Sequence, residues 1–219
     1  MTRLYAARVA LPKSDAELHA LLGRVPAWRR EAALRLALPD DRARSLCAFL
    51  LARYVVKRET GRELEARPSA SGRPEAERPG VFFSLSHSGG AVACAVGASP
   101  VGADVERIRP VRTEALARRF FAPEEVQALL RLPPERRLAA FFALWTQKES
   151  YLKALGTGLA RPLSSFCVLP TAAGGALVRD SAAGAPPLRL HTFGLLPGYA
   201  LSAACEGDVS AVLADEAML

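Results

Sequence analysis

The stretch VFFSLSHSGGAVACAVGASPVGADVERI, residues 81–108, contains three apolar runs separated by two turn signals. Gly89–Gly90 lies between the first two runs, and Ser99–Pro100 lies between the last two. Short runs of this kind, rich in Val and Phe and bounded by Gly, Ser and Pro, are typical of β-strands joined by tight turns. The stretch therefore predicts three β-strands in the middle of the chain.

Helices are predicted on both sides of these strands. LPDDRARSLCAFLLARYVVKRETG (38–61) has apolar residues at helical spacing, aspartates that can cap its start and a glycine at its end, which predicts a helix of about four turns. In FAPEEVQALLRL (121–132), Pro123 falls in a first helical turn. LAAFFALWTQKESYLKALGTG (138–158) is the strongest helical pattern, and Gly156 closes it.

The last part of the chain alternates apolar runs with Gly and Pro turns, which predicts antiparallel strands in SFCVLP, ALVRD, LRLHTF and GYALSAACE. Residues 65–80, with three prolines, predict a loop. Each half of the chain thus has helices followed by strands, as in the α+β class. FFSLSHSGGAVACAV also resembles RLHTFGLLPGYALSAAC, but too weakly to prove an internal repeat.

A chain of 219 residues with 50% hydrophobic composition can bury a substantial core, in one large domain or two joined halves. Its apolar stretches are shorter than the roughly 18 residues of a membrane span, and its first residues do not resemble a signal peptide. We therefore expect a cytoplasmic protein without a membrane partner. The four cysteines form no CxxC pair, which favours buried apolar roles over zinc or redox sites.

The net charge of +7 is unevenly distributed. Residues 1–110 have 18 Lys and Arg against 12 Asp and Glu, and residues 24–62 alone have ten against four. Such a bias predicts an anionic partner: a nucleic acid, a phosphorylated small molecule or an acidic protein. The alternative is an arginine-rich composition on solvated helix faces.

VGADVERI places two carboxylates at alternate positions of a predicted strand. Asp104 and Glu106 then share a face with Gly102, while the valines and the alanine between them face the core. At about 7 Å between Cα atoms, both carboxylates can bind one hard cation such as Mg²⁺, and Gly102 leaves room for a phosphate. The alternative is an edge strand that displays its acids to water.

Two further candidates lie outside this strand. Glu149 and Lys153 are spaced i,i+4 and share a helix face with Trp145, although such pairs are usually surface ion pairs. His87 stands between two serines before Gly89–Gly90, where imidazole, hydroxyls and backbone amides could hold a phosphate. A Ser–His hydrolase does not fit, because the GxSxG elbow is missing and adjacent strand side chains point apart.

Five segments, in this order and spacing, resemble the 4'-phosphopantetheinyl transferases: SGRP (71–74), FSLSHSGG (83–90), VGADVERIRP (101–110), RRFFAPEE (118–125) and WTQKESYLKALGTG (145–158). The chain is most similar to the longer, surfactin-synthetase-activating class. The resemblance implies transfer of the phosphopantetheine arm of coenzyme A to a serine of an apo acyl or peptidyl carrier protein, with release of 3',5'-ADP. It also implies a pseudo-dimer of two similar α+β halves, 1–105 and 106–219, that works as a monomer with its active site in the cleft between them.

The resemblance also implies roles for individual residues. The Mg²⁺ ligands would be Asp104, Glu106 and Glu149. The groups that act on the pyrophosphate during catalysis would be His87, Lys153 and Glu149. The remaining coenzyme A contacts would be Ser86, Arg44, Ser45 and Arg29, the last beside Arg30, together with Arg73, which replaces the lysine of the family's usual Gly-Lys-Pro and keeps its charge.

Three other functions are compatible with parts of the pattern. A metal-dependent nuclease could use the acidic pair and the basic segment, but it leaves the Trp–Lys–Glu–Lys helix unexplained and the chain has no basic patch interleaved with aromatics. A non-catalytic carrier-binding module, or a coenzyme A-binding protein without transfer activity, would be expected to lose part of the acidic triad. The sequence keeps all three acids, so we expect an enzyme with no nucleic acid partner.

Overall fold

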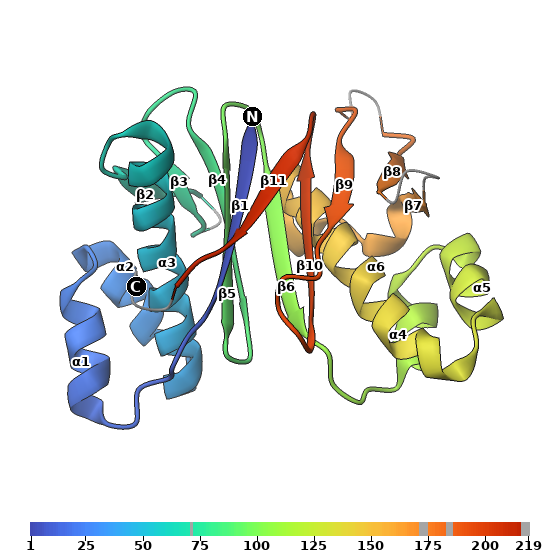
Figure 1. The fold of residues 1–219 in the computed structure, drawn as a ribbon, viewed down its shortest axis with the longest axis horizontal. Helices are drawn as coiled ribbons and strands as arrows, with labels where there is room; N and C mark the ends of the chain where they lie inside the picture. The colour runs from blue at the N-terminus through green and yellow to red at the C-terminus, as the bar shows by residue number, and fades with distance from the viewer. Residues whose placement is uncertain (71, 171–174, 183–185, 216–219) are drawn as a thin grey trace.

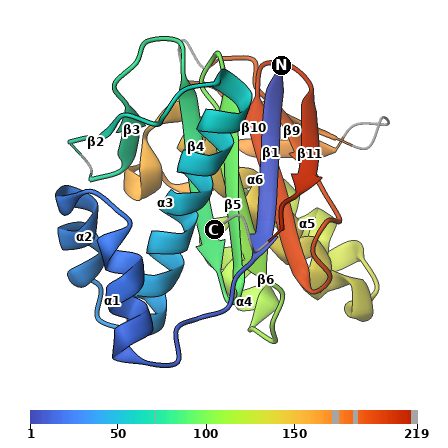
Figure 2. The same cartoon turned by 60° about the vertical axis from the view of Figure 1, so that its left-hand side comes forward.

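The computed structural model describes residues 1–70, 72–170, 175–182 and 186–215. Two β-sheets pack face to face, and helices cover the outer side of each sheet, so that the molecule has four layers (Figures 1 and 2). Helices α1 to α3 lie on one side and α4 to α6 on the other. A small-residue apolar core between the sheets contains Ala93 and Ala95 from one sheet and Ala103 and Val105 from the other.

The first half contains β1 (Thr2–Arg8), α1 (Asp15–Gly23), α2 (Ala27–Leu34), α3 (Pro39–Thr60), β2 (Ala66–Pro68), β3 (Pro74–Ala76), β4 (Phe82–Ser88) and β5 (Ala91–Gly97). The second half contains β6 (Gly102–Arg107), α4 (Thr113–Phe120), α5 (Pro123–Arg131), α6 (Pro134–Leu155), the 3₁₀ turns η1 (Gly158–Ala160) and η2 (Leu163–Ser165), β7 (Cys167–Pro170), β8 (Ala176–Arg179), β9 (Arg189–Thr192), β10 (Tyr199–Cys205) and β11 (Val209–Leu213).

The two halves repeat one element order: a strand, three helices, a short hairpin and two further strands. The third helix of each half, α3 or α6, has 22 residues and ends at a left-handed glycine, Gly61 or Gly156. In the sheets, β5 lies between β1 and β4 as β10 lies between β6 and β9. The predicted α+β fold with two similar halves is confirmed, and the faint sequence echo corresponds to the hairpins β4–β5 and β9–β10.

The halves are not independent, because the last strand crosses back. β11 pairs in parallel with β1 and extends the first sheet, giving the order β11-β1-β5-β4. The second sheet has the order β6-β10-β9-β8-β7. The predicted boundary at residue 105 stays a prediction; it falls inside β6 (102–107), whose hydrogen-bonded partner is β10.

Three local expectations need correction. Helix α3 is about six turns long, not four, because its apolar pattern continues through 22 residues at 3.6 residues per turn. The aspartates do not cap this helix. Asp40 and Asp41 lie within its first turn, where their negative charges interact favourably with the helix dipole, and Leu38 occupies the N-cap without a side-chain hydrogen bond. The predicted loop 65–80 contains the short hairpin β2–β3.

Other expectations are met by the described residues. All four cysteines are buried, and none of them forms a disulfide in the described part of the chain. No helix in the described part of the chain is both long and apolar enough to cross a bilayer. The predicted alternation along β6 is confirmed, because Ala103 and Val105 enter the core between the sheets while Gly102 packs against α6.

Gly102 has a different purpose from the one its sequence position suggested. A Cβ atom on this glycine would lie 1.7 Å from the Ser150 carbonyl oxygen and 2.7 Å from the Ala154 amide nitrogen. The glycine therefore lets the backbone of α6 approach β6, and the expectation that it leaves room for a phosphate is wrong. This close approach brings Lys153 and Glu149 of α6 to the side of β6 that carries its acids.

We expect Gly102→Ala to destabilise the fold by at least 1–3 kcal/mol, because neither β6 nor α6 can move without disturbing the core. Gly23→Ala is the matched control, since a Cβ there meets no atom within 4 Å. Urea unfolding should show a lower midpoint for Gly102→Ala and an unchanged or slightly higher one for Gly23→Ala. Equal midpoints for the two variants would contradict this packing account.

Candidate active site

The two halves enclose a cavity of about 310 Å³. Its charged and polar lining comes from Arg29, Arg73 and His87 of the first half and from Asp104, Glu106 and Lys153 of the second. A second cavity of about 590 Å³ shares Asp104 and Glu106 and adds Glu149, the aromatic rings of Phe120 and Trp145, and the cations Arg119 and Arg161. The acidic pair therefore stands between an electropositive cavity and a more apolar one.

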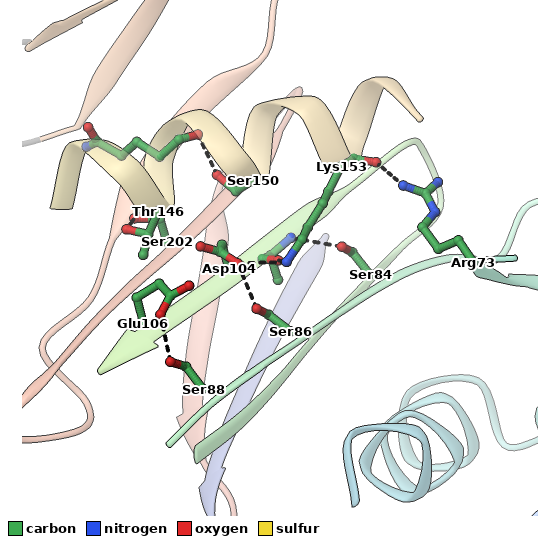
Figure 3. A network of polar contacts seen from close by, with 12 residues as sticks. Arg73, Ser84, Ser86, Ser88, Asp104, Glu106, Thr146, Ser150, Lys153 and Ser202 are labelled. Carbon is green, nitrogen blue, oxygen red and sulfur yellow. Dashed lines mark hydrogen bonds and ion pairs between the residues drawn. The ribbon is translucent and has the colours of Figure 1, made fainter. Parts of the chain in front are cut away.

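Asp104 is buried, with 4% of its surface exposed. The Ser86 hydroxyl donates to its Oδ1 at 2.7 Å, and the Lys153 ammonium donates to the same oxygen at 2.7 Å (Figure 3). The other oxygen, Oδ2, is buried without a hydrogen-bond partner. A buried carboxylate oxygen with no partner is costly, so this atom is a candidate ligand for a cation.

Glu106 and Glu149 complete an acidic group around Asp104. The Ser88 hydroxyl donates to Glu106 Oε2 at 2.6 Å. Burial, followed by the charges of Asp104 and Glu106, raises the pKa of Glu149 to about 6. Burial also raises the pKa of Glu106, and Asp104 adds to the shift. These shifts show that the three acids repel one another and lack full compensation from the protein.

Lys153 links this acidic group to the first half. Its ammonium contacts Asp104 and donates to the Ala103 carbonyl at 3.0 Å. Its own carbonyl accepts a 2.7 Å hydrogen bond from Arg73 Nη1, so that Arg73 spans from the β2–β3 hairpin to the end of α6. The predicted phosphate contact of Arg73 stays a prediction, and Ser71 of the SGRP segment lies outside the described residues.

The other wall of the cavity is basic. Arg29 is 9% exposed, donates through Nη2 to the Ser45 carbonyl at 2.8 Å and to its hydroxyl, and has a buried Nε without a partner. Burial, followed by the nearby charges of Lys153, Arg44 and Arg29, lowers the pKa of His87 to about 4. His87 is therefore neutral at pH 7, in surroundings that favour an anion.

The basic segment 24–62 is not one exposed patch. Arg30 is exposed, whereas its neighbour Arg29 is buried. Arg44 pairs with Asp41 and reaches the Gly89 carbonyl at 3.4 Å. Of the predicted basic contacts, Arg29 lines the cavity and is held by Ser45, and Arg44 lies near enough to His87 to lower its pKa; Arg44, Ser45 and Arg30 are outside the lining.

Among the described residues, no group of three His, Cys, Asp or Glu side chains is already arranged to hold a metal ion. At Asp104, the Lys153 ammonium already contacts Oδ1, where a metal ion would otherwise bind. The acids are close enough to shift one another's pKa, and Asp104 Oδ2 is unpaired, so the donor set fits a hard cation even though its geometry is not preformed.

Comparison with known proteins identifies the family. A 4'-phosphopantetheinyl transferase psf-1 of Bacillus pumilus is 36% identical over 178 residues, 80% of this chain and 76% of that protein. The chain belongs to the 4'-phosphopantetheinyl transferase superfamily. The model of that superfamily matches residues 100–204. The 4'-phosphopantetheinyl transferase Sfp of Bacillus subtilis (strain 168) is 30% identical over 206 residues, 91% of this chain and 90% of that protein, so the predicted surfactin-activating class is confirmed.

A solved structure, the holo-[acyl-carrier-protein] synthase of Thermotoga maritima, matches 48% of this chain and 61% of that chain, with a TM-score of 0.41 and 23% identity. The two-half architecture is shown by the repeated element order and strand order of this transferase.

An ion pair that we did not predict anchors α6, the helix of the transferase that carries Glu149. Lys148, beside Glu149 in the chain, is fully buried and donates to Glu125 Oε1 at 2.6 Å and Oε2 at 2.8 Å. Lys148 also donates to the Phe166 carbonyl at 2.8 Å, and Glu125 accepts from the Val168 amide at 2.7 Å. Both residues lie in the segments that carry the family resemblance, but spacing alone could not show that they meet.

We expect Glu125→Gln to cost about 3–5 kcal/mol of stability, because it leaves the Lys148 charge buried without a counter-ion. The adjacent Glu124 provides a matched control, since it pairs with Arg179 at 2.8 Å while both side chains are more than half exposed. Glu124→Gln should leave the urea midpoint nearly unchanged, because an exposed ion pair contributes little to stability. Urea midpoints of the two variants test this, and a Glu125→Gln midpoint equal to that of Glu124→Gln would refute the anchoring role.

Proposed function

We propose that the chain transfers the phosphopantetheine arm of coenzyme A to a serine of an apo acyl or peptidyl carrier protein, with Mg²⁺, and releases 3',5'-ADP. One observation carries the proposal beyond family membership: the central cavity is lined by two residues with unpaired buried polar atoms, Asp104 Oδ2 and Arg29 Nε. The carboxylate oxygen can bind a cation or accept a hydrogen bond, and the guanidinium nitrogen can donate to an acceptor such as an anion. A divalent cation on a diphosphate supplies both.

The residues present fit Mg²⁺. Asp104, Glu106 and Glu149 offer hard oxygen donors, and their mutual repulsion would be relieved by a divalent charge. When bound, the cation would neutralise charge on the diphosphate. Lys153 forms an ion pair with Asp104 and places its ammonium group one helical turn after Glu149.

The basic wall of the cavity suits the nucleotide part of coenzyme A. Arg29 and Arg44 supply positive charge beside His87, and Ser45 fixes the guanidinium of Arg29. His87 is neutral before the ligand binds, so its ring can donate one hydrogen bond to a phosphate oxygen. Arg73 is tied to α6 through one nitrogen and can offer its remaining donors to a phosphate.

The reaction itself needs one bond made and one broken. The carrier serine Oγ forms a bond to the phosphorus that carries pantetheine, the bond from that phosphorus to the bridging oxygen breaks, and 3',5'-ADP leaves with that oxygen. Glu149 would take the serine proton as general base, because its carboxylate lines the same cavity as Asp104 and Glu106. Lys153 and His87 stabilise the charge on the departing diphosphate oxygens.

The proposed partners follow from this chemistry. Coenzyme A and an apo carrier protein are the substrates, and one chain supplies both walls of the cavity, which suits a monomer. Neither a nucleic acid nor a membrane is needed for the reaction.

The deciding experiment incubates the protein with Mg²⁺, coenzyme A and several apo carrier proteins, and follows the intact mass of each carrier. We expect a gain of one phosphopantetheine group on at least one carrier and its loss when the acceptor serine is replaced by alanine. If every carrier keeps its mass while a known transferase modifies the same samples, the proposed function is wrong.

Glu149→Gln separates two roles of this residue, because it keeps size and hydrogen bonding but removes the charge. We expect a loss of turnover on the order of 10²–10⁴-fold at ordinary Mg²⁺, with partial recovery as Mg²⁺ is raised, since the residue serves mainly as a ligand and partly as the base. Steady-state rates across an Mg²⁺ titration provide the measurement. Full activity at ordinary Mg²⁺ would exclude both roles.

A further inference from the structure

The two sheets meet along strands that end their respective hydrogen-bonded ladders. β4 is the last strand of the first sheet, and β6 is the first strand of the second. The two strands lie side by side in the interior of the molecule (Figure 3). Strand edges carry backbone N–H and C=O groups that need partners when they are buried.

Alternate serines of β4 provide such partners. The Ser84 hydroxyl accepts a 3.0 Å hydrogen bond from the Ala103 amide, and the Ser88 hydroxyl accepts a 3.1 Å bond from the Arg107 amide. Between them, Ser86 donates to Asp104. Because strand side chains alternate, all three hydroxyls lie on one face of β4. Those of Ser84 and Ser88 take the place of ladder bonds to the backbone of β6, and that of Ser86 bonds a side chain of β6.

Ser88 fills both hydrogen-bonding roles of its hydroxyl at once. The oxygen accepts from the Arg107 amide, and the proton is donated to Glu106 Oε2 at 2.6 Å. An accepted backbone bond fixes where the hydroxyl oxygen lies, so the donated bond fixes one oxygen of Glu106 in turn. The same serine that joins the strands therefore also orients a carboxylate.

We propose that Ser84, Ser86 and Ser88 form a hydroxyl seam that joins the two halves, and that Ser86 and Ser88 are positioning residues that aim Asp104 and Glu106 at the cation. The positioning role rests on the proposed function. The seam itself rests only on the hydrogen bonds between β4 and β6.

The physical need for positioning comes from the repulsion among the acids. Asp104, Glu106 and Glu149 line one cavity, and repulsion between like charges would turn an unrestrained Glu106 side chain away from the other two. A short bond from Ser88 opposes that rotation. It also leaves Glu106 Oε1 available to a ligand.

The test uses the serines as matched controls for one another. Ser84→Ala removes a seam bond that touches no carboxylate, whereas Ser88→Ala removes both a seam bond and the bond to Glu106. Amide hydrogen exchange by NMR reports the seam. We expect exchange on the order of tenfold faster at the Ala103 amide in Ser84→Ala and at the Arg107 amide in Ser88→Ala.

Binding of Mn²⁺ to the protein with coenzyme A present, followed by electron paramagnetic resonance of the free ion, reports positioning without catalysis. We expect affinity on the order of tenfold weaker in Ser88→Ala, near-unchanged affinity in Ser84→Ala, and recovery in Ser88→Thr, which keeps the hydroxyl.

Each outcome decides one part of the proposal. Unchanged exchange at both amides refutes the seam. Equal loss of Mn²⁺ affinity in Ser84→Ala and Ser88→Ala, or no loss in Ser88→Ala, refutes the positioning role. If the unchanged protein binds no Mn²⁺, the metal site of the proposed function fails and takes the positioning role with it, while the exchange rates still judge the seam.

Discussion

The repulsion among Asp104, Glu106 and Glu149 is the constraint on which the site depends. Folding brings these acids together at the junction of the halves, where burial strengthens their interaction and raises the pKa of Glu149 to about 6. The ammonium of Lys153 and the serine hydroxyls of β4 offset part of this repulsion, but one oxygen of Asp104 still lacks a partner. This deficit is the feature of the site that supports the proposed binding of a cation.

The internal repeat explains why a single cleft has this chemistry. The equivalent first strands of the halves are β1 and β6, but the outer edge of β1 is hydrogen-bonded to β11, whereas the outer edge of β6 faces β4. The edge of β6 that faces β4 is therefore the one where Asp104 and Glu106 meet the serines of the other half. The returning strand β11 covers the edge of β1 that corresponds to the open edge of β6. It also joins the last strand of the chain to the first.

Helix α6, which carries Glu149 and Lys153, is held by contacts with both halves. Gly102 lets α6 lie directly on β6, and the buried pair of Lys148 and Glu125 joins α6 to α5 and to the start of β7. From the first half, Arg73 donates to the Lys153 carbonyl in the last turn of α6. These contacts all lie in the last two turns of α6, so the part of the helix that carries Glu149 and Lys153 is fixed on several sides.

The sequence by itself determined the local structure and the chemical groups. Turn residues and apolar alternation predicted β4, β5 and β6, glycine ends and apolar spacing predicted α3 and α6, and the family motifs named the acids, His87 and Lys153. Only the tertiary structure decided which groups meet. The burial of Arg29, the contact of Ser86 with Asp104, the pairing of Glu125 with Lys148 and the true purpose of Gly102 all depend on the approach of elements distant in the chain. Periodicity reports which face of its own element a residue occupies, but it carries no information about what packs against that face.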